Sequence, residues 1–484
     1  MKPAGYPQEP KHMWQRFYEL TQVPRPSKKE EKVRQYLIDA AKKAGMEYRT
    51  DKVGNVFIYI PATPGYETHA PLILQSHMDM VCDKVPGSTH DFDNDPLKLK
   101  IDNGWIRAID TTLGADNGFG CAVMLACLDD KTLKHPPLEL LFTVDEETGL
   151  HGALNLDASL LTGRRLLNID TEEWGAAYVG CAGGIDYKMR RKLATHKCPE
   201  NYVSCRVDVG GLKGGHSGMD IIWGRGNAIK ILGSLIYKSL DFGVRLVEFS
   251  GGRAHNIIPR DAYAVVNLPA DKIEEFKKLV EKVIGDFKAI LPQEDQGVFG
   301  SFKMLDKAIS KAYSESDTDD FMRLLSLFPH GAHAFNWQAS EPLVSSSNNL
   351  AICQIIGESL FIESSLRFFD RKEAVLTEEK LTILGLEYGL DVAKEGEYPS
   401  WKPVFDGALL KTAKEVHGSA FGEELKVKAI HAGLECGIIK DRLGELDALS
   451  IGPNLLGVHS PTEGLEISSS NHFWKFFVGI LERL

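Results

Sequence analysis

The stretch Leu72-Ile73-Leu74-Gln75-Ser76-His77-Met78-Asp79 joins an apolar run directly to a histidine and an aspartate. A short apolar run bounded by polar residues is typical of a buried strand in a parallel sheet. Similar runs occupy 138–144 and 166–169, a β-rich run occupies 56–60, and a helix of small residues is expected at 122–128. Strands that alternate with helices in this way predict a doubly wound, mainly parallel α/β sheet over about the first 180 residues.

The segment before these strands carries the signals of a helix. Ser27 and Glu30 have the spacing of a capping box, in which each side chain bonds the backbone at the other position. We expect the helix to begin there, to run to about Ala44 and to end at Gly45.

Charged side chains follow the apolar runs at the points where the strands are expected to end. Ligands of open α/β sheets bind outside the carboxyl ends of the strands, so these side chains are expected to meet at one edge of the sheet. Without such a shared ligand, each charged residue directly after a buried strand would need a partner that is itself removed from water, and removing charges from water is costly. The residues are His77 and Asp79 after 72–76, Glu146 and Glu147 after 138–144, Asp170 after 166–169, His459 after 449–453, and Asp116 in the glycine-rich turn 113–118.

Imidazole and carboxylate groups without a thiolate form a ligand set for a divalent metal. This set favours Zn, Mn or Co in a catalytic site over a closed structural zinc site. Two histidines and three carboxylates suit two metals that share a bridging carboxylate. Asp79, two residues from His77, can hold the far ring nitrogen of that histidine and fix its tautomer. Of the adjacent Glu146 and Glu147, one can bind metal while the other acts as general base and later as general acid.

The pattern of the chain changes after the glycine-rich stretch 180–184. Two rounds of alternating strands and amphipathic helices follow, at about 202–290 and 350–388, and α/β character returns beyond the linker 399–403. The chain is therefore expected to be a doubly wound mixed α/β domain interrupted by a large inserted α+β domain with an internal duplication. The predicted parts are 1–184 and 399–484 for the α/β domain and 185–398 for the inserted domain.

The composition narrows the range of partners and compartments. The 484 residues include 56 Lys and Arg against 67 Asp and Glu, a formal net charge of -11 with a pI near 5.8. Such a chain repels nucleic-acid phosphates and anionic membranes, so neither is expected as a partner. The first 20 residues contain no apolar signal segment, the apolar runs are far shorter than the roughly 20 residues that span a bilayer, and the eight cysteines show no paired spacing. We expect a cytoplasmic protein with reduced thiols, part of whose acidic excess surrounds metal.

The charged residues at the strand ends lie in motifs that carry a family resemblance. The motifs are His77-x-Asp79, Gly114-Ala-Asp116-Asn-Gly118, Glu146-Glu147, Asp170 and His459. This set resembles the dinuclear-zinc peptidases of clan MH, which include carnosinases and aminoacylases. Three longer strings, Thr111–Gly118, Gly180–Asp186 and His431–Gly437, are similar to those of the bacterial aminoacyl-histidine dipeptidases.

The resemblance implies a role for each of these residues. Asp79 would support His77, and Glu146 would activate the catalytic water. The family also has a cis peptide bond after the bridging aspartate, here between Asp116 and Asn117. The implied metal ligands are Asp116 as the bridge, His77 and Asp170 in one site, and Glu147 and His459 in the other.

The inserted domain carries a second set of implied site residues. His216, in the loop 211–218, resembles the lid histidine that helps to stabilise the oxyanion, and Asn256 and Arg367 match positions that hold the substrate backbone and its C-terminal carboxylate. The usual lid of the family is one ferredoxin-like unit, so an insertion of nearly twice that length implies a lid domain of two ferredoxin-like halves. The second half would then do within one chain what a partner's lid does elsewhere, and the sequence leaves open whether the chain also forms a homodimer.

The resemblance implies a metal-dependent dipeptidase that hydrolyses unblocked dipeptides, with Xaa-His substrates preferred. An N-acyl-amino-acid hydrolase could use the same dimetal site, and a comparison of a free dipeptide with its acetylated form would separate the two. A catalytically inactive metal- or peptide-binding protein is disfavoured because the ligand set and Glu146 are intact. The glycine-rich strings do not indicate nucleotide binding, because neither GxGxxG between strand and helix nor GKS or GKT occurs.

Overall fold

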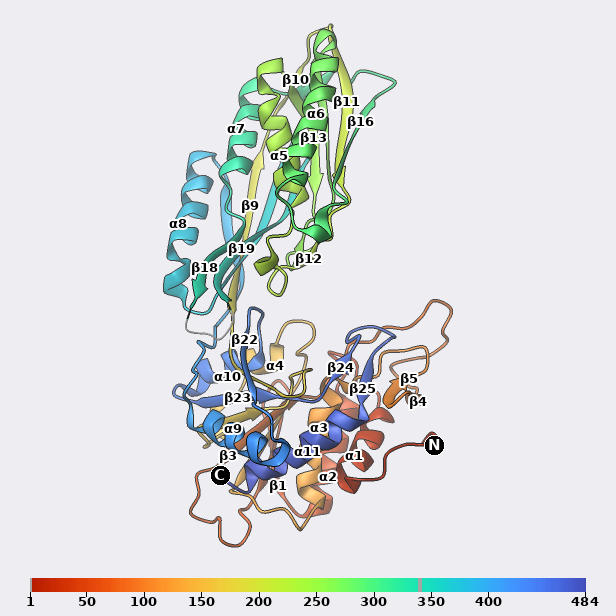
Figure 1. Cartoon of the computed structure of the whole chain (residues 1–484), viewed down its shortest axis with the longest axis vertical. Helices are drawn as coiled ribbons and strands as arrows, with labels where there is room; N and C mark the ends of the chain where they lie inside the picture. The colour runs from red at the N-terminus through yellow and green to blue at the C-terminus, as the bar shows by residue number, and fades with distance from the viewer. Residues whose placement is uncertain (1, 338–341) are drawn as a thin grey trace. The chain divides into compact units, whose positions relative to one another are not determined.

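The computed structural model describes residues 2–337 and 342–484, and within it the chain divides into two compact units (Figure 1). The first unit comprises Met1–Cys181, Trp401–Ala429 and Leu434–Leu484, and the second comprises Ala182–Ser400 and Ile430–Gly433. Each unit has its own apolar core. The predicted fold, a mixed α/β architecture with an inserted unit, is confirmed.

The first unit is built on an eight-stranded sheet of the order β1-β2-β6-β3-β7-β23-β8-β22. The four central strands β6, β3, β7 and β23 run parallel to one another, and β1, β2 and β8 pair antiparallel. Two of these central strands, β3 and β6, are buried along their whole length, which explains why they appear in the sequence as continuous apolar runs. The bounds are β1 Glu47–Thr50, β2 Val56–Ile60, β3 Leu72–His77, β6 Leu138–Thr143, β7 Arg165–Asn168, β8 Ala176–Cys181, β22 Lys426–Ile430 and β23 Asp447–Ile451.

Helices cover this sheet on two faces. Leu72 and Leu74 of β3 point into the larger core, which contains apolar side chains of α1, α2, α3, α9 and α11. Gln75 lies on the opposite face, because side chains alternate along a strand, and there it bonds Glu435 of α10. The helices are α1 Lys11–Thr21, α2 Glu31–Ala44, α3 Ala115–Asp129, α4 His151–Leu154, α9 Ala408–Phe421, α10 Glu435–Leu443 and α11 Ile467–Leu481.

The start of α2 differs from the prediction. The helix begins at Glu31, and the Ser27 hydroxyl donates to Asp79 Oδ2 at 2.8 Å instead of capping the helix, so the predicted capping box is wrong. The predicted end is confirmed, since Gly45 follows Ala44 with a φ of 70°, a left-handed conformation that glycine adopts without strain.

A small sheet of the first unit positions the loop that carries His459. Its order is β24-β25-β5-β4, and the loop joins β24 to β25. The strands are β4 Leu99–Asp102, β5 Trp105–Ala108, β24 Leu455–Leu456 and β25 Gly464–Glu466.

The second unit contains a larger antiparallel sheet of the order β16-β11-β15-β13-β19-β20-β9-β21, with β18 paired to β19. Helices α5 to α8 lie against this sheet (Figure 1), and their apolar side chains belong to the core of this unit. Its helices are α5 Ala228–Lys238, α6 Ile273–Lys288, α7 Glu315–Leu327 and α8 Arg371–Glu387. Its strands are β9 Gly183–Lys192, β10 Thr195–Lys197, β11 Tyr202–Gly210, β12 Gly215–His216, β13 Arg245–Gly251, β14 Ile257–Ile258, β15 Ala262–Pro269, β16 Phe299–Met304, β17 Lys311–Tyr313, β18 Gly331–Asn336, β19 Leu343–Ile356, β20 Ser359–Phe368 and β21 Asp391–Tyr398.

The main strands and helices of the second unit form two halves, and these are nested rather than consecutive. One half contains β11, α5, β13, β15, α6 and β16, and the other contains β9, α7, β19, β20, α8 and β21. In both halves the strands lie in the order fourth, first, third, second, and the two second strands, β13 and β19, pair at the centre. The first half is inserted after the opening strand of the other half, which explains why the chain shows two rounds of the same pattern.

Across the described part of the chain, no helix is both long enough and apolar enough to cross a membrane.

Candidate metal centre

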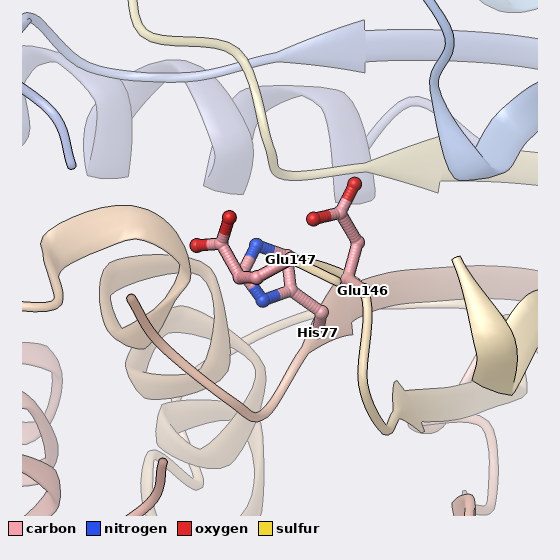
Figure 2. Close-up of side chains that lie close together, drawn as sticks. All are labelled: His77, Glu146 and Glu147. Atoms are coloured by element: carbon pink, nitrogen blue, oxygen red, sulfur yellow. The ribbon is translucent and has the colours of Figure 1, made fainter. Parts of the chain in front are cut away.

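The carboxyl ends of three neighbouring parallel strands bring the predicted site residues of the first unit together. His77 is the last residue of β3, the pair Glu146 and Glu147 follows β6, and Asp170 follows β7. Because β3 lies between β6 and β7, these ends meet at one edge of the sheet. Figure 2 shows the His77 ring beside the two glutamate side chains, and donor atoms of the three residues lie within 4.8 Å of one another.

Asp116 lies between two groups of donor atoms. Its Oδ1 is 2.9 Å from His77 Nε2, which is also 3.5 Å from Asp170 Oδ1. Its Oδ2 is 3.2 Å from His459 Nε2, which is also 3.0 Å from Glu147 Oε2. Each of the two groups, His77–Asp116–Asp170 and Asp116–Glu147–His459, has its donor atoms within 4.8 Å of one another. We call these five residues and Glu146 the rim.

The rim residues fit divalent metal ions. Each group offers one imidazole nitrogen and carboxylate oxygens, the donors that Zn, Mn and Co accept, and three protein donors leave a coordination position for water. The second carboxylate oxygen of Glu147, Oε1, is buried and has no hydrogen-bond partner among the described residues. A buried carboxylate oxygen without a donor is costly unless a cation approaches it.

The electrostatics of the rim favour positive charge at both histidines. Burial by itself would lower the pKa of His77, but the carboxylates of Asp170 and Asp116 raise it well above its ordinary value. Hydrogen bonds to Asp116 and Glu147 raise the pKa of His459 to about 11. Burial would raise the pKa of the Asp116 carboxyl, yet its hydrogen bonds with both histidines hold it below its usual range. The carboxylates of the rim therefore attract positive charge, either as protons on the histidines or as a cation.

Glu146 differs from its neighbour Glu147 in its contacts. Glu147 pairs with His459, whereas the structure gives the Glu146 carboxyl no such partner among the described residues. Burial raises the pKa of Glu146 well above its ordinary value, and the nearby carboxylates of Asp170 and Glu435 add to this effect against the opposing charge of His77. A carboxyl group with a raised pKa is suited to exchange protons near neutral pH.

Asp79 links the strand ends of β3 and β6. Its Oδ1 is 3.3 Å from His77 Nδ1, on the far side of the ring from the Asp116 contact. The same carboxylate accepts from the backbone N–H groups of Glu146 at 3.2 Å and Glu147 at 3.3 Å, and from the Ser27 hydroxyl. One buried carboxylate therefore bonds the backbone of both glutamates and lies beside the His77 ring.

Two residues that hold the rim in place were missed by sequence reasoning. Glu463 accepts from the backbone N–H groups of Leu113, Gly114 and Ala115 at 2.7 to 2.9 Å and so fixes the turn that presents Asp116. The buried guanidinium of Arg25 donates to the carbonyls of residues 78, 79 and 114. Neither residue lies in a motif; the nearest signal is that Glu463 follows His459 by four positions. The peptide bond between Asp116 and Asn117 is cis, as the resemblance implies.

The second unit brings His216, Asn256 and Arg367 into one region. His216 pairs with Ile257 across the short β12–β14 ladder, and the N–H of Ser217 donates to the carbonyl of Asn256 at 2.8 Å. Arg367 of β20 approaches the Ser217 hydroxyl at 3.4 Å and donates to the Tyr398 hydroxyl at 2.8 Å.

The His216 ring has a defined tautomer. Its Nδ1 accepts from the backbone N–H groups of Gly218 at 3.2 Å and Met219 at 3.1 Å, so the proton of the neutral ring is on Nε2. Burial and the positive charge of Arg367 lower the pKa of His216 to about 4, which keeps the ring neutral at physiological pH. His216 therefore presents one N–H donor.

Arg367 is a buried cation without an acidic partner. Its exposed fraction is 6%, it forms no salt bridge with a carboxylate among the described residues, and its Nε has no hydrogen-bond partner there. Buried guanidinium groups are normally paired with anions. The Arg367 guanidinium is therefore suited to pair with an anionic group.

Comparison with known proteins gives matches along the whole chain. A family model described as peptidase family M20/M25/M40 matches residues 73–483. The chain is 36% identical over 478 residues to the cytosol non-specific dipeptidase of Escherichia coli strain K12, with 98% of both chains covered. It is 35% identical to the crystal structure of aminoacylhistidine dipeptidase from Vibrio alginolyticus, with a TM-score of 0.91 and coverage of 98% of this chain and 97% of that one. A tripeptidase structure from Staphylococcus aureus, at 18% identity and a TM-score of 0.57, shares the fold over 98% and 97% of the two chains.

A sheet whose carboxyl edge gathers imidazole and carboxylate donors, together with these matches, defines a metal-dependent hydrolase of peptide bonds. The chain belongs to peptidase family M20/M25/M40. The resemblance drawn from the sequence motifs is thereby confirmed at the level of the family.

Proposed function

We propose that this chain is a cytoplasmic dipeptidase that hydrolyses unblocked dipeptides and prefers Xaa-His substrates. The main observation behind this proposal is the position of the Asp116 carboxylate, whose two oxygens lie 2.9 Å from His77 Nε2 and 3.2 Å from His459 Nε2. The substrate class is supported by the relatives named as a non-specific dipeptidase and an aminoacylhistidine dipeptidase, and the compartment by the first of these names.

Two divalent ions, Zn in preference to Mn or Co, would be held by the rim. His77 and Asp170 would bind one ion, Glu147 and His459 the other, and Asp116 both. When bound, such ions polarise the scissile carbonyl and lower the pKa of a water molecule from 15.7 to about 7.

Glu146 would act as the general base and then as the general acid. Its raised pKa supports both roles, because a carboxyl group that ionises nearer neutral pH can take a proton from water and return it to the leaving amine. Its backbone N–H is bonded to Asp79, which would keep the side chain in position relative to His77.

The second unit would supply the groups that bind the substrate. The Nε2–H of His216 would donate to the oxyanion, since Nδ1 is occupied by two backbone donors. Arg367 would bind the C-terminal carboxylate of the dipeptide, and Asn256 would bind the peptide backbone. The role of Arg367 is supported by its burial and by its lack of an acidic partner among the described residues.

The test is a panel of dipeptides assayed together with metal analysis on one purified sample. We expect about two divalent ions per chain, cleavage of free dipeptides with Xaa-His among the best, little cleavage of N-acetylated forms, and loss of activity on chelation that Zn, Mn or Co restores. Cleavage by a metal-free sample would contradict the proposed mechanism. A preference for the acetylated substrates would instead identify an N-acyl-amino-acid hydrolase.

A further inference from the structure

A row of buried polar side chains crosses the central sheet of the first unit just beneath the rim. Gln75 of β3 is opposite Asn168 of β7, and Asn168 is opposite Ser450 of β23. Asn168 Nδ2 donates to Gln75 Oε1 at 2.6 Å, the Ser450 hydroxyl bonds Asn168 Oδ1, and the hydroxyl groups of Ser450 and Thr171 are 2.7 Å apart. The row thus connects three neighbouring strands by side-chain hydrogen bonds.

Glu435, the first residue of α10, is at one end of this row. Its Oε2 accepts from Gln75 Nε2 at 2.6 Å and from the Thr143 hydroxyl at 2.7 Å. Its side chain has an exposed fraction of 0%, and its Oε1 has no hydrogen-bond partner among the described residues. This carboxylate oxygen thus bonds one side chain of β3 and one of β6, and Gln75 Nε2 also donates directly to the Thr143 hydroxyl at 3.1 Å.

Three of these side chains lie two or three positions before a rim residue in the sequence. Gln75 precedes His77 by two positions and shares its side of β3, and Asn168 precedes Asp170 by two positions. Thr143 is opposite His77 in the β3–β6 register and precedes Glu146 by three positions. The hydrogen bonds of Glu435 therefore connect the two strand ends that carry His77 and the glutamate pair.

Polar side chains at these positions are not required by the fold. Ile73, on the same face of β3 as Gln75, is fully buried and apolar, and burial of amide and hydroxyl groups is costly unless every group is paired. Residues that support metal ligands from behind typically orient them, and their loss weakens metal affinity about 10- to 100-fold.

We propose that Glu435 is a positioning residue that fixes the strand ends bearing His77 and Glu146 through its hydrogen bonds with Gln75 and Thr143. The proposal rests on the proposed function of the rim as a metal centre. It extends that function by assigning a role to a residue outside the rim.

The test compares Glu435→Ala with Glu139→Ala. Glu139 is a matched control: it is a buried glutamate at the opposite end of β6, where it accepts from the backbone N–H groups of Thr162 and Gly163. We measure Co²⁺ affinity by titration and the visible spectrum of the Co²⁺-loaded protein, which reports ligand geometry without any substrate. Glu435→Ala should weaken affinity about 10- to 100-fold and change the spectrum, whereas Glu139→Ala should change neither.

Glu435→Gln separates positioning from charge. The glutamine carbonyl can still accept from both Gln75 and Thr143, so this variant should keep affinity and spectrum within about threefold of the parent protein. If it fails as Glu435→Ala does, the carboxylate acts through its charge and the proposal is overturned. Equal losses in Glu139→Ala and Glu435→Ala, or no loss in either, would also overturn it.

Thr143→Val keeps the test decisive where Glu435→Ala fails to fold. Valine has the shape of threonine but donates no hydrogen bond, so Co²⁺ affinity should fall about threefold to tenfold. An unchanged affinity in this variant would overturn the proposal. Failure of the proposed function is a separate result, since it would appear as absent dipeptide cleavage by the parent protein.

Discussion

The rim of the first unit and the His216 region of the second hold their polar side chains by different means. His77 ends a strand that is paired on both sides, with β6 and β7 as neighbours. His216 lies in a ladder of only two residues, β12, whose single partner is β14. The position of the first histidine follows from the register of a buried sheet, whereas that of the second follows from turn contacts such as the one between Ser217 and Asn256.

This difference suits two tasks. Metal ligands must be held to within a fraction of an ångström, and a paired strand end whose second ring nitrogen faces Asp79 provides that rigidity. His216, which is proposed to bind the substrate, lies on a short turn, and segments with few paired backbone groups open at lower cost. The comparison predicts that substitutions in the rim change metal binding and kcat, and that substitutions in the second unit change substrate affinity.

The largest expected effect is a loss of activity on substitution of Glu146, and it distinguishes this glutamate from its neighbour Glu147. Glu146→Gln removes the proposed general base, so kcat should fall about 10³- to 10⁴-fold while both metals remain bound. Glu147→Gln is the matched control, because its carboxylate pairs with His459 and it should lose metal as well as activity. The measurements are steady-state kinetics and metal content. Loss of metal in both variants would show that the two glutamates share one role.

The next largest effect is expected from a substitution in the second unit, at Arg367. Arg367→Met should lower kcat/KM for dipeptides about 100-fold, mainly through KM, because methionine offers no guanidinium to pair with the substrate carboxylate. Dipeptide amides provide the internal control, since they lack that carboxylate and should be cleaved poorly but equally by both proteins. A decrease in kcat with bound metal lost would place Arg367 among the residues that support the rim instead.

The rim could be predicted from the sequence because buried parallel strands appear as continuous apolar runs. The runs ending at His77, Val144 and Ile169 identify three strand ends, and the rule that ligands gather at carboxyl ends brings them together. Asp79 was predicted as the partner of His77 because two residues at a strand end share one side.

The supporting residues could not be predicted, because their partners are distant in the chain. Ser27 has the spacing of a helix cap, yet its hydroxyl bonds Asp79, 52 positions away. Glu463 bonds the turn at Leu113, 350 positions away, and Glu435 bonds Gln75, 360 positions away. Long-range pairing also determines the nested halves of the second unit, since β9 finds its neighbours β20 and β21 only after the whole first half has intervened.

A pH dependence of stability is expected from the second unit. Burial, with the charge of Arg367 adding to it, lowers the pKa of His431 to about 3, while an unfolded chain binds that proton near pH 6.5. Between these values the unfolded state binds more protons, so stability falls as pH falls, by up to about 1.4 kcal/mol per pH unit for this residue, and is unaffected above about pH 6.5. Urea unfolding between pH 7 and 4.5 measures the slope.

His431→Gln should make that slope shallower, because the amide can keep the hydrogen bond that the ring forms with the Ser347 hydroxyl at 2.8 Å but takes up no proton. His196→Gln is the control in the same unit, since His196 is exposed. Equal slopes in the parent and His431→Gln would mean that this histidine does not contribute to acid destabilisation.

The smallest effect tests how far the rigidity of the rim depends on single supporting contacts. Ser27→Ala removes one of three donors to Asp79, whose carboxylate keeps the N–H groups of Glu146 and Glu147. Loss of one such hydrogen bond corresponds to about 0.5–1.5 kcal/mol, so kcat should fall only about threefold to tenfold, with KM and metal content unchanged. Asp79→Asn should cost far more, because an amide cannot accept from all three donors and hold the His77 ring as well. If Ser27→Ala were as damaging as Asp79→Asn, the hydroxyl and not the carboxylate would set the position of the strand ends, and the rim would depend on a loop contact just as His216 does.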